Sequence, residues 1–244
     1  MWTSGANVLV RTLLSPPCPG CDRVLERPLA GPICELCWLS LADISPPFCD
    51  RCGEPAAPGY PTGECSRCEQ TGPSFSMARS AGRYHHALRN LIHAFKYDGR
   101  RFLSRPLAQL LRQHCGNVLS TADAVIPVPL HRWRKLRRGF NQSDDLAREL
   151  GLPVWRVLRR VRLGVPQAGL PAASRQTNVR GAFALRCPSV GRIPRRLSRA
   201  TVVLIDDVMT TGATARECSR VLLEAGVRDV RVLTVARAAA APRS

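Results

Sequence analysis

The spacing of the cysteines constrains the fold more than any other feature of this chain. Eight of the eleven cysteines lie before residue 70, in four Cys-x-x-Cys pairs. Adding 31 to the numbers of the first two pairs gives the other two, so the segment is an internal repeat. Each copy carries a complete set of four thiols: Cys18, Cys21, Cys34 and Cys37 in the first, and Cys49, Cys52, Cys65 and Cys68 in the second.

Two short-spaced cysteine pairs are the usual ligand set of a structural zinc ion. Each Cys-x-x-Cys turn presents two sulfurs to one side of a tetrahedral metal. Disulfides are the competing interpretation, but they require an oxidising compartment. A redox pair is an alternative for one Cys-x-x-Cys, and four pairs in tandem argue against it. We therefore expect two closed zinc sites, one per copy, with ligands interleaved between the copies as the main alternative. The isolated thiols of Cys115, Cys187 and Cys218 are expected to be buried or incidental.

The chain divides into three parts by composition. Residues 14–74 are rich in Pro, Gly and Cys and show little periodicity, so this part needs metal to fold. Residues 75–237 alternate predicted strands with predicted helices, and residues 238–244 look like a disordered tail. The strands are expected at 82–84, 123–127, 201–205 and 230–235, and the helices at 87–97, 103–115, 142–150 and 213–226. This alternation predicts an α/β fold with a doubly wound, mostly parallel sheet.

Residues 202–214, VVLIDDVMTTGAT, contain the clearest functional pattern. The aliphatic run is typical of a strand buried on both faces. Asp206 and Asp207 follow at its carboxyl end, where open α/β sheets bind ligands. The next turn offers hydroxyls, backbone N–H groups and the start of a helix to a phosphate. Carboxylates beside a phosphate cradle suit a ribose 5-phosphate, whereas the structural alternative is a buried strand followed by a capped helix.

These thirteen residues resemble the 5-phosphoribosyl 1-pyrophosphate (PRPP) signature of type I phosphoribosyltransferases. The resemblance implies that Asp206 and Asp207 are catalytic residues that hold the ribose hydroxyls. It also implies that the 5-phosphate binds at Met209, Thr210, Thr211, Gly212, Ala213 and Thr214. The expected fold is then that of a type I phosphoribosyltransferase, and magnesium is expected to arrive with PRPP.

Three further stretches resemble phosphate-binding segments of the same family. Val128 and Pro129 directly follow the predicted strand 123–127. The pyrophosphate loop of those enzymes lies at this place. The basic stretch 132–138, which includes Arg138, follows and is suited to neutralising pyrophosphate or gripping a nucleic-acid backbone. A solvated basic loop is the alternative. Residues 164–180 read as an extended connection. The stretch 167–183 falls where the resemblance places the family's mobile catalytic loop, with Arg175, Asn178 and Arg180 as lid residues and a plain surface loop as the alternative.

The order of all these motifs is similar to that of the ComF family. Its pattern is a cysteine-rich double zinc ribbon (here residues 14–74), a helix ending in Phe-Lys-Tyr, then PVP, RGFNQ, NVRGAF and the PRPP signature. Lys96 and Tyr97 of the Phe-Lys-Tyr segment are candidate PRPP-binding residues, although helix capping alone would explain a basic residue and a glycine there. The resemblance implies an association with the uptake of single-stranded DNA in natural transformation, and proteins of the DNA-uptake machinery as partners.

The net charge of +18 suits a polyanionic partner, whether nucleic acid or a phosphorylated metabolite. However, Lys96 and Lys135 are the only lysines among 36 basic residues, an arginine excess that GC-rich coding would also produce. The sequence therefore leaves two functions open. One is a phosphoribosyltransferase that transfers pentosyl groups from PRPP to a nitrogen nucleophile. The other is a non-catalytic module that binds single-stranded DNA or a partner, with PRPP as a regulatory or vestigial ligand.

The chain shows no feature of a membrane or exported protein. No apolar run approaches the 18 or more residues of a membrane span. The N-terminal segment is interrupted by Arg11 and lacks the layout of a signal peptide. We therefore expect a cytoplasmic location.

Overall fold

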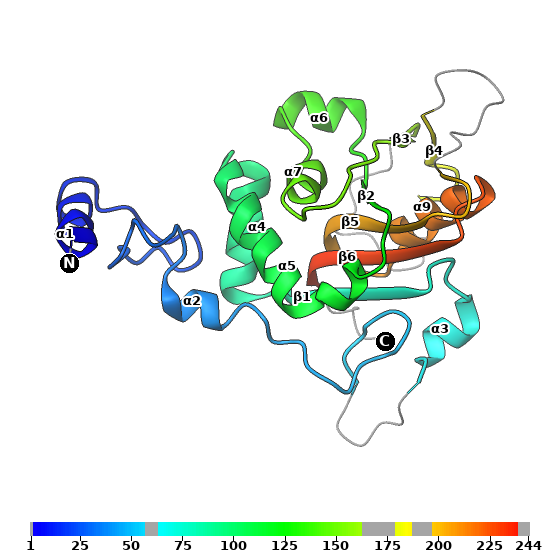
Figure 1. Ribbon diagram of the computed structural model, residues 1–244, viewed down its shortest axis with the longest axis horizontal. Helices are drawn as coiled ribbons and strands as arrows, with labels where there is room; N and C mark the ends of the chain where they lie inside the picture. The colour runs from blue at the N-terminus through cyan, green and yellow to red at the C-terminus, as the bar shows by residue number, and fades with distance from the viewer. Residues whose placement is uncertain (1, 57–62, 163–178, 187–196, 239–244) are drawn as a thin grey trace, which may run out of the picture.

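The computed structural model describes residues 2–56, 63–162, 179–186 and 197–238. A parallel four-stranded sheet in the order β1-β6-β5-β2 organises the larger part of the chain (Figure 1). Its strands are β1 (Met77–Arg83), β2 (Ala124–Pro127), β5 (Thr201–Met209) and β6 (Asp229–Arg237). A separate antiparallel pair consists of β3 (Leu158–Arg160) and β4 (Phe183–Leu185).

Helices cover both faces of the sheet. One face carries α4 (His86–Tyr97), α5 (Ser104–Leu119) and α7 (Gln142–Arg148), and the other carries α9 (Ala213–Glu224). A short 3-10 helix, η1 (Arg101–Leu103), precedes α5, and α6 (Arg132–Arg138) precedes α7. Alternate residues of β5 point to opposite faces: Val203 and Ile205 pack with α4, α5 and α7, whereas Val202 and Leu204 pack with α9. The predicted doubly wound α/β architecture is confirmed.

Both cysteine repeats precede the sheet in the sequence. The first cysteine repeat (residues 18–37) follows α1 (Trp2–Leu14) and includes the start of α2 (Glu35–Leu39). The second cysteine repeat (residues 49–68) includes the start of α3 (Ser66–Thr71). Figure 1 shows α1 and the first repeat at one end of the molecule, whereas the second repeat lies along the sheet beside β1. Short helices therefore occur within the segment for which the sequence showed little periodicity, because metal-site turns rather than an apolar stripe initiate them.

The structure corrects several predicted boundaries. The strand expected at residues 201–205 continues to Met209, because β6 lies alongside and supplies backbone partners beyond the point where β2 ends. The strand expected at 82–84 begins at Met77 for the same reason, since β6 pairs with it throughout. The helix expected at 142–150 ends at Arg148. The basic stretch 132–138, for which a solvated loop was the alternative interpretation, is the exposed helix α6, capped by His131.

Other expectations meet the limits of the described residues. The expected connection 164–180 lies outside them except for its last two residues, which form a turn. Of the expected tail 238–244, only Ala238 is described, and its N–H donates to the carbonyl of Met209 at 2.9 Å. Cys115 and Cys218 are buried as expected, and Cys187 is not described. Within the described residues, no helix is long and apolar enough to cross a bilayer.

Candidate PRPP site and metal centres

The sulfurs gather into two groups that match the two repeats. The four thiols of the first repeat lie within 4.8 Å of one another, and so do those of the second repeat. Zinc bound tetrahedrally to sulfur at about 2.3 Å requires sulfurs about 3.8 Å apart. Cys21 and Cys34 are 3.7 Å apart, Cys52 and Cys65 are 3.7 Å apart, and Cys49 and Cys68 are 3.9 Å apart. Each set therefore fits one zinc ion, and the interleaved arrangement is excluded.

Backbone N–H groups point at the sulfurs in the same way in both repeats. The N–H of Cys34 donates to the sulfur of Cys18 at 3.3 Å, and the N–H of Cys65 donates to that of Cys49 at 3.2 Å. These two bonds are one repeat length apart in the sequence. Donors to sulfur favour the thiolate form, which is the form that ligates a metal.

The acid pair lies inside β5 at the carboxyl edge of the sheet, and it faces a cavity of about 480 Å³. Asp206 pairs in register with Thr234 of β6, which lines the same cavity. The neighbouring strand β2 ends at Pro127, and the N–H of Val128 still donates to the carbonyl of Ile205 at 3.0 Å. Because β2 stops here while β5 continues, the acid pair lies at a step in the sheet edge. That step leaves the space that the cavity occupies.

Both carboxylate oxygens of Asp207 are engaged by the protein. The ammonium of Lys96 lies 2.6 Å from Oδ1, and the side-chain amide of Gln142 donates to Oδ2 at 2.5 Å. Burial alone would lower the pKa of Lys96, but the charge and hydrogen bond of Asp207 raise it above its ordinary value. Lys96 is therefore a permanent cation at the cavity wall. Lys96 was a candidate only because of the Phe-Lys-Tyr segment, and the structure places it in contact with the signature strand.

Asp206 has a different environment and a free acceptor. Its Oδ1 accepts from the hydroxyl of Ser143 at 3.0 Å and from the N–H of Asp207 at 2.9 Å. No hydrogen bond to Oδ2 occurs within the described part of the chain. Burial and the charge of Asp207 raise the pKa of Asp206 to about 7, against the opposing charge of Lys96. This carboxyl is therefore the one available to a ligand hydroxyl.

The turn after β5 has the form of an anion cradle. Thr210, Thr211 and Thr214 line the cavity together with Met209, Gly212 and Ala213. Gly212 has a left-handed φ of 74°, and a Cβ there would lie 2.9 Å from the Cε of Met209. It is also the N-cap of α9, so no side chain caps this helix, and its first turn carries no acidic residue. Uncapped N–H groups at a helix start attract an anion.

Three arginines from two elements line the same cavity. Arg134 and Arg138 come from α6, and Arg160 comes from β3. Arg138 donates to Gln142 at 2.5 Å and lies over the ring of Tyr97, with 5.0 Å to the centroid. Burial and the charge of Arg134 lower the pKa of Arg160, whose guanidinium lies over the ring of Phe183.

Arg134 and Arg160 form no ion pair with a carboxylate in the described part of the chain. All 18 acidic side chains of the chain lie among the described residues, and no ion pair joins any of them to either arginine. Two cations that form no ion pair within the described residues therefore face one cavity. An anionic ligand is the species that would satisfy them.

Most of the predicted PRPP-binding residues line the cavity, and two arginines do not lie among its described lining residues. The cavity is lined by Asp206, Asp207 and residues 209–214, and by Val128, Pro129, Arg138, Lys96 and Tyr97. Arg180 is exposed and is not among the described residues that line the cavity. The hydrogen bond from Arg220 lowers the pKa of Glu217 on α9, and the charge of Arg180 adds a smaller effect in the same direction. Arg175 lies outside the described residues.

Sequence reasoning missed three residues that build the site. Gln142 and Ser143 hold the acid pair, and Arg160 supplies a cation from a short strand. Gln142 is the last residue of the RGFNQ segment, which resembles the ComF family. The resemblance indicated the segment but assigned no role to Gln142. Nothing in the local sequence distinguishes Arg160 from Arg159, since both lie in a run of arginines.

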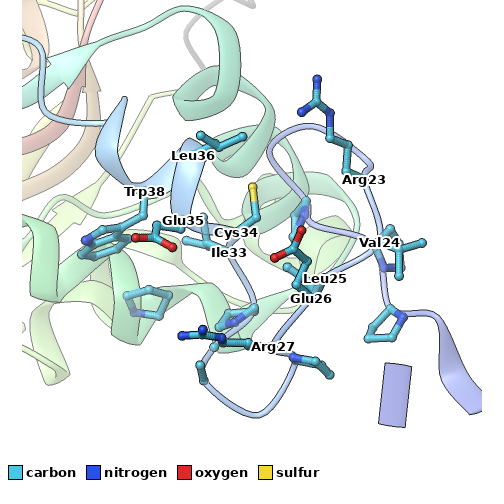
Figure 2. Close-up of a pocket in the computed structure, with 18 of the residues that line it drawn as sticks. Arg23, Val24, Leu25, Glu26, Arg27, Ile33, Cys34, Glu35, Leu36 and Trp38 are labelled. Atoms are coloured by element: carbon cyan, nitrogen blue, oxygen red, sulfur yellow. The ribbon is translucent and has the colours of Figure 1, made fainter. Parts of the chain in front are cut away.

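A larger cavity of about 1260 Å³ lies elsewhere, between α1, the first cysteine repeat and the start of α5 (Figure 2). Proline and aliphatic side chains predominate in its wall, with Leu25, Ile33 and Trp38 among them. None of the signature residues lines it. Its charged lining residues are Arg23, Glu26, Arg27, Glu35 and Arg105, and neither the acid pair nor the turn after β5 reaches it, so its size alone does not make it the candidate site.

Comparisons with known proteins agree with this arrangement. Residues 9–69 match the model of the double zinc ribbon domain. Competence protein F of Haemophilus influenzae is 36% identical over 205 residues, which cover 79% of this chain and 85% of that protein. The chain belongs to the ComF family. DNA utilization protein YhgH of Salmonella typhi is 34% identical over 234 residues, covering 90% of this ComF-family chain and 97% of the relative.

Among solved structures, the glutamine PRPP amidotransferase of B. subtilis, complexed with ADP and GMP, is similar to part of the chain. It is 20% identical and has a TM-score of 0.33, and the match covers 54% of this chain and 25% of that one. A TM-score this low supports no inference about the ligand.

Proposed function

We propose that this ComF-family protein binds PRPP with magnesium and acts as a phosphoribosyltransferase. The observation that carries the proposal is the convergence in one cavity of an available carboxylate, an uncapped helix start and unpaired arginines. PRPP carries the three groups that this set matches: ribose hydroxyls, a 5-phosphate and a pyrophosphate. A ligand without all three would leave part of the set without a partner.

Each part of PRPP has a place in this proposal. The free Oδ2 of Asp206 accepts a ribose hydroxyl, while Lys96 and Gln142 keep Asp207 fixed behind it. The turn from Thr210 to Thr214 binds the 5-phosphate. The pyrophosphate extends toward Val128 and Pro129 and the arginines of α6 and β3.

The donor set also fits magnesium, which prefers oxygen ligands and usually retains water and substrate phosphates. Magnesium bound with the pyrophosphate neutralises the charge that develops on this leaving group. Asp206 orients the ribose so that C1 is open to a nitrogen nucleophile, and the cationic wall attracts the departing pyrophosphate. Most of the acceleration in such a displacement comes from orientation and preorganised charge.

The cellular role is inferred from the relatives. Their names associate Competence protein F with competence and YhgH with DNA utilization. We propose that this protein acts in the cytoplasm on incoming single-stranded DNA, together with the DNA-uptake machinery. The exposed helix α6, with Arg132, Arg137 and Lys135 beside the cavity mouth, supports contact with phosphates.

Ligand binding is tested by calorimetry with PRPP and magnesium. Replacing both Asp206 and Asp207 with alanine should abolish binding while leaving both zinc ions bound. The single variant Asp206→Asn keeps the Lys96–Asp207 pair and should bind at least about tenfold more weakly, because a hydrogen bond to a charged group contributes about 1.5–3 kcal/mol. Asp98→Ala, at an exposed position after α4, is the matched control. Equal affinities of wild type and the double variant would refute the site.

Catalysis is tested separately from binding. Exchange of labelled pyrophosphate into PRPP in the presence of a panel of bases requires reversible transfer, so it distinguishes an enzyme from a binding module. Exchange with one of the bases would identify the acceptor class. Binding without exchange for any base would favour the alternative in which PRPP is a regulatory ligand.

A further inference from the structure

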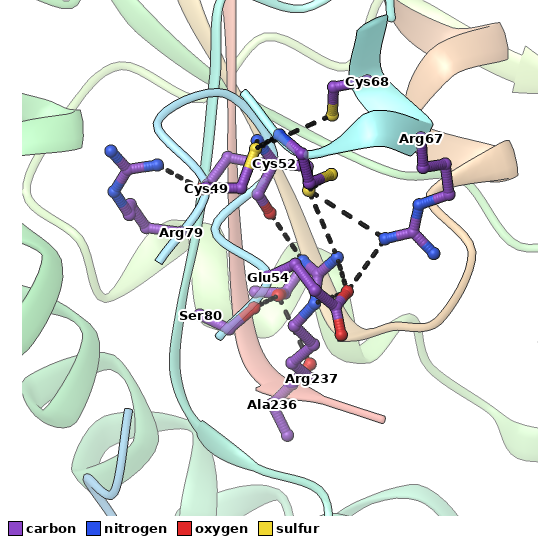
Figure 3. A network of polar contacts seen from close by, with 12 residues as sticks. Cys49, Cys52, Glu54, Arg67, Cys68, Arg79, Ser80, Ala236 and Arg237 are labelled. Carbon is purple, nitrogen blue, oxygen red and sulfur yellow. Dashed lines mark hydrogen bonds and ion pairs between the residues drawn. The ribbon is translucent and has the colours of Figure 1, made fainter. Parts of the chain in front are cut away.

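Arg237 is a buried arginine at the end of β6 that the proposed reaction does not use. Its side chain is 2% exposed. The guanidinium donates to the carbonyl of Cys52 at 2.6 Å, lies 3.6 Å from the sulfur of Cys52, and pairs with Glu54 at 2.5 Å (Figure 3). An arginine is almost never this buried without such partners. Arg237 therefore depends on the second cysteine repeat for its burial.

Glu54 joins this arginine to the other half of the repeat. Its Oε2 accepts from both Arg237 and Arg67, the latter at 2.8 Å. Arg67 follows Cys65 in α3, and its guanidinium also lies 3.9 Å from the sulfur of Cys52. Figure 3 shows the three charged side chains packed against the thiols. The network thus includes residues from both cysteine pairs of the second metal site.

The backbone of Arg237 contacts the candidate PRPP site. Arg237 pairs in register with Met209, and its carbonyl accepts from the N–H of Tyr84 at 2.7 Å. The next residue, Ala238, donates to the carbonyl of Met209 at 2.9 Å. Met209, Tyr84 and Ala238 all line the cavity, and Met209 immediately precedes the phosphate turn. One residue therefore contacts the second metal site through its side chain and the ligand cavity through its backbone.

The second repeat is also closely attached to the neighbouring strand. The N–H of Ala78 in β1 donates to the carbonyl of Arg51 at 2.6 Å. A Cβ at Gly53 would lie 2.5 Å from the carbonyl oxygen of Ala78, and Gly53 has a φ of 68°. This close approach leaves little freedom between the repeat and the sheet. By contrast, the first repeat contacts α4, where Asn90 donates to the carbonyl of Gly20 at 2.9 Å.

We propose that Arg237 is a positioning residue that couples metal binding at the second cysteine repeat to ligand binding in the PRPP cavity. Without the metal, the carbonyl of Cys52 and the carboxylate of Glu54 are no longer held in place. The buried guanidinium then loses fixed partners, and the end of β6 shifts beside Met209. Coupling of this kind is reciprocal. PRPP must raise the affinity for the second metal by the same factor by which the metal raises the affinity for PRPP.

The coupling, which rests on the proposed PRPP site, is measured as the affinity for zinc. Zinc-loaded wild type is titrated to equilibrium with a chromogenic chelator, with and without saturating PRPP and magnesium. We expect PRPP to protect one zinc equivalent by raising its affinity about fivefold or more, within the usual range of coupling between sites, and to leave the affinity of the other equivalent unchanged. PRPP that binds without raising the affinity of either equivalent overturns the coupling alone. A wild type that does not bind PRPP overturns the proposed function and the coupling with it.

Variants identify Arg237 as the connecting residue. Arg237→Met should retain two zinc ions but lose the protection by PRPP, and its PRPP affinity should fall by the same factor. Arg237→Lys keeps the charge without the planar fork that reaches both Cys52 and Glu54, so it should restore little of the coupling. Arg231→Met removes an arginine from the other end of β6, where it pairs with Asp229, and should behave as wild type. Undiminished protection in Arg237→Met would refute the role of this residue, and the wild-type experiment remains decisive if that variant does not fold.

Discussion

Replacing Lys96 with methionine should destabilise the protein by about 3–5 kcal/mol at pH 8, the range for breaking a buried ion pair by removing one partner. The ammonium lies 2.6 Å from Asp207, and the two side chains are 15% and 7% exposed. Methionine has a similar length but supplies no charge. Asp207 would then keep one hydrogen bond, from Gln142, beside a second carboxyl and without a cation.

The loss should depend on pH. Burial and Asp207 already raise the pKa of Asp206 to about 7, and the charge of Lys96 opposes that rise. Removing Lys96 therefore raises the pKa of Asp206 further. A carboxyl with a raised pKa in the folded state penalises folding above that pKa, and the penalty is relieved as the pH falls through it toward the unfolded value near 4. At pH 5.5 Asp206 is protonated and Asp207 no longer lies beside a second charge, so the loss should fall to about 1–2 kcal/mol.

Urea unfolding of zinc-loaded protein at the two pH values measures this difference. Lys135→Met is the control, because Lys135 is the only other lysine and is exposed on α6. The double variant Lys96→Met/Asp207→Asn should recover most of the stability at pH 8, since a neutral amide requires no counter-ion. A loss below about 1 kcal/mol, equal losses at both pH values, or no recovery in the double variant would refute the reasoning.

Three further predictions concern the ligands. Arg160→Gln should weaken PRPP binding about tenfold and leave ribose 5-phosphate binding unchanged, because a charge-assisted contact to the pyrophosphate is lost; Arg159→Gln, at the exposed neighbouring position, is the calorimetric control, and equal effects on both ligands would contradict the assignment. Metal analysis of freshly purified, reduced protein should return about two zinc ions per chain, one per four-cysteine set; one or none would contradict this. If α6 contacts single-stranded DNA, changing Arg134, Arg137 and Arg138 to alanine should lower the slope of log affinity against log salt by about 0.7 per lost phosphate contact. A wild type that binds no single strand at low salt would refute the DNA contact.

Local sequence patterns predicted the features that are formed by residues close together in the sequence. The two cysteine sets follow from a spacing of a few residues within each turn and from the length of the repeat. The order of strand, acid pair, turn and helix from Val202 to Thr214 is also contiguous, so its outline was predictable. The end of β5 was not, because the pairing that extends it to Met209 comes from β6.

The tertiary structure alone decided which distant side chains share the site. Lys96 and Gln142 meet Asp207 because α4 and α7 cover the same face of the sheet, and Arg160 reaches the cavity from β3. Arg237 meets Glu54 across 183 residues because the second cysteine repeat packs against the sheet beside β1. The sequence by itself determined the chemistry of each segment, since a metal turn or a phosphate turn is formed by adjacent residues. Only the order of the strands and the packing of the helices determined which segments act together, since those contacts join residues with no periodic relation in the chain.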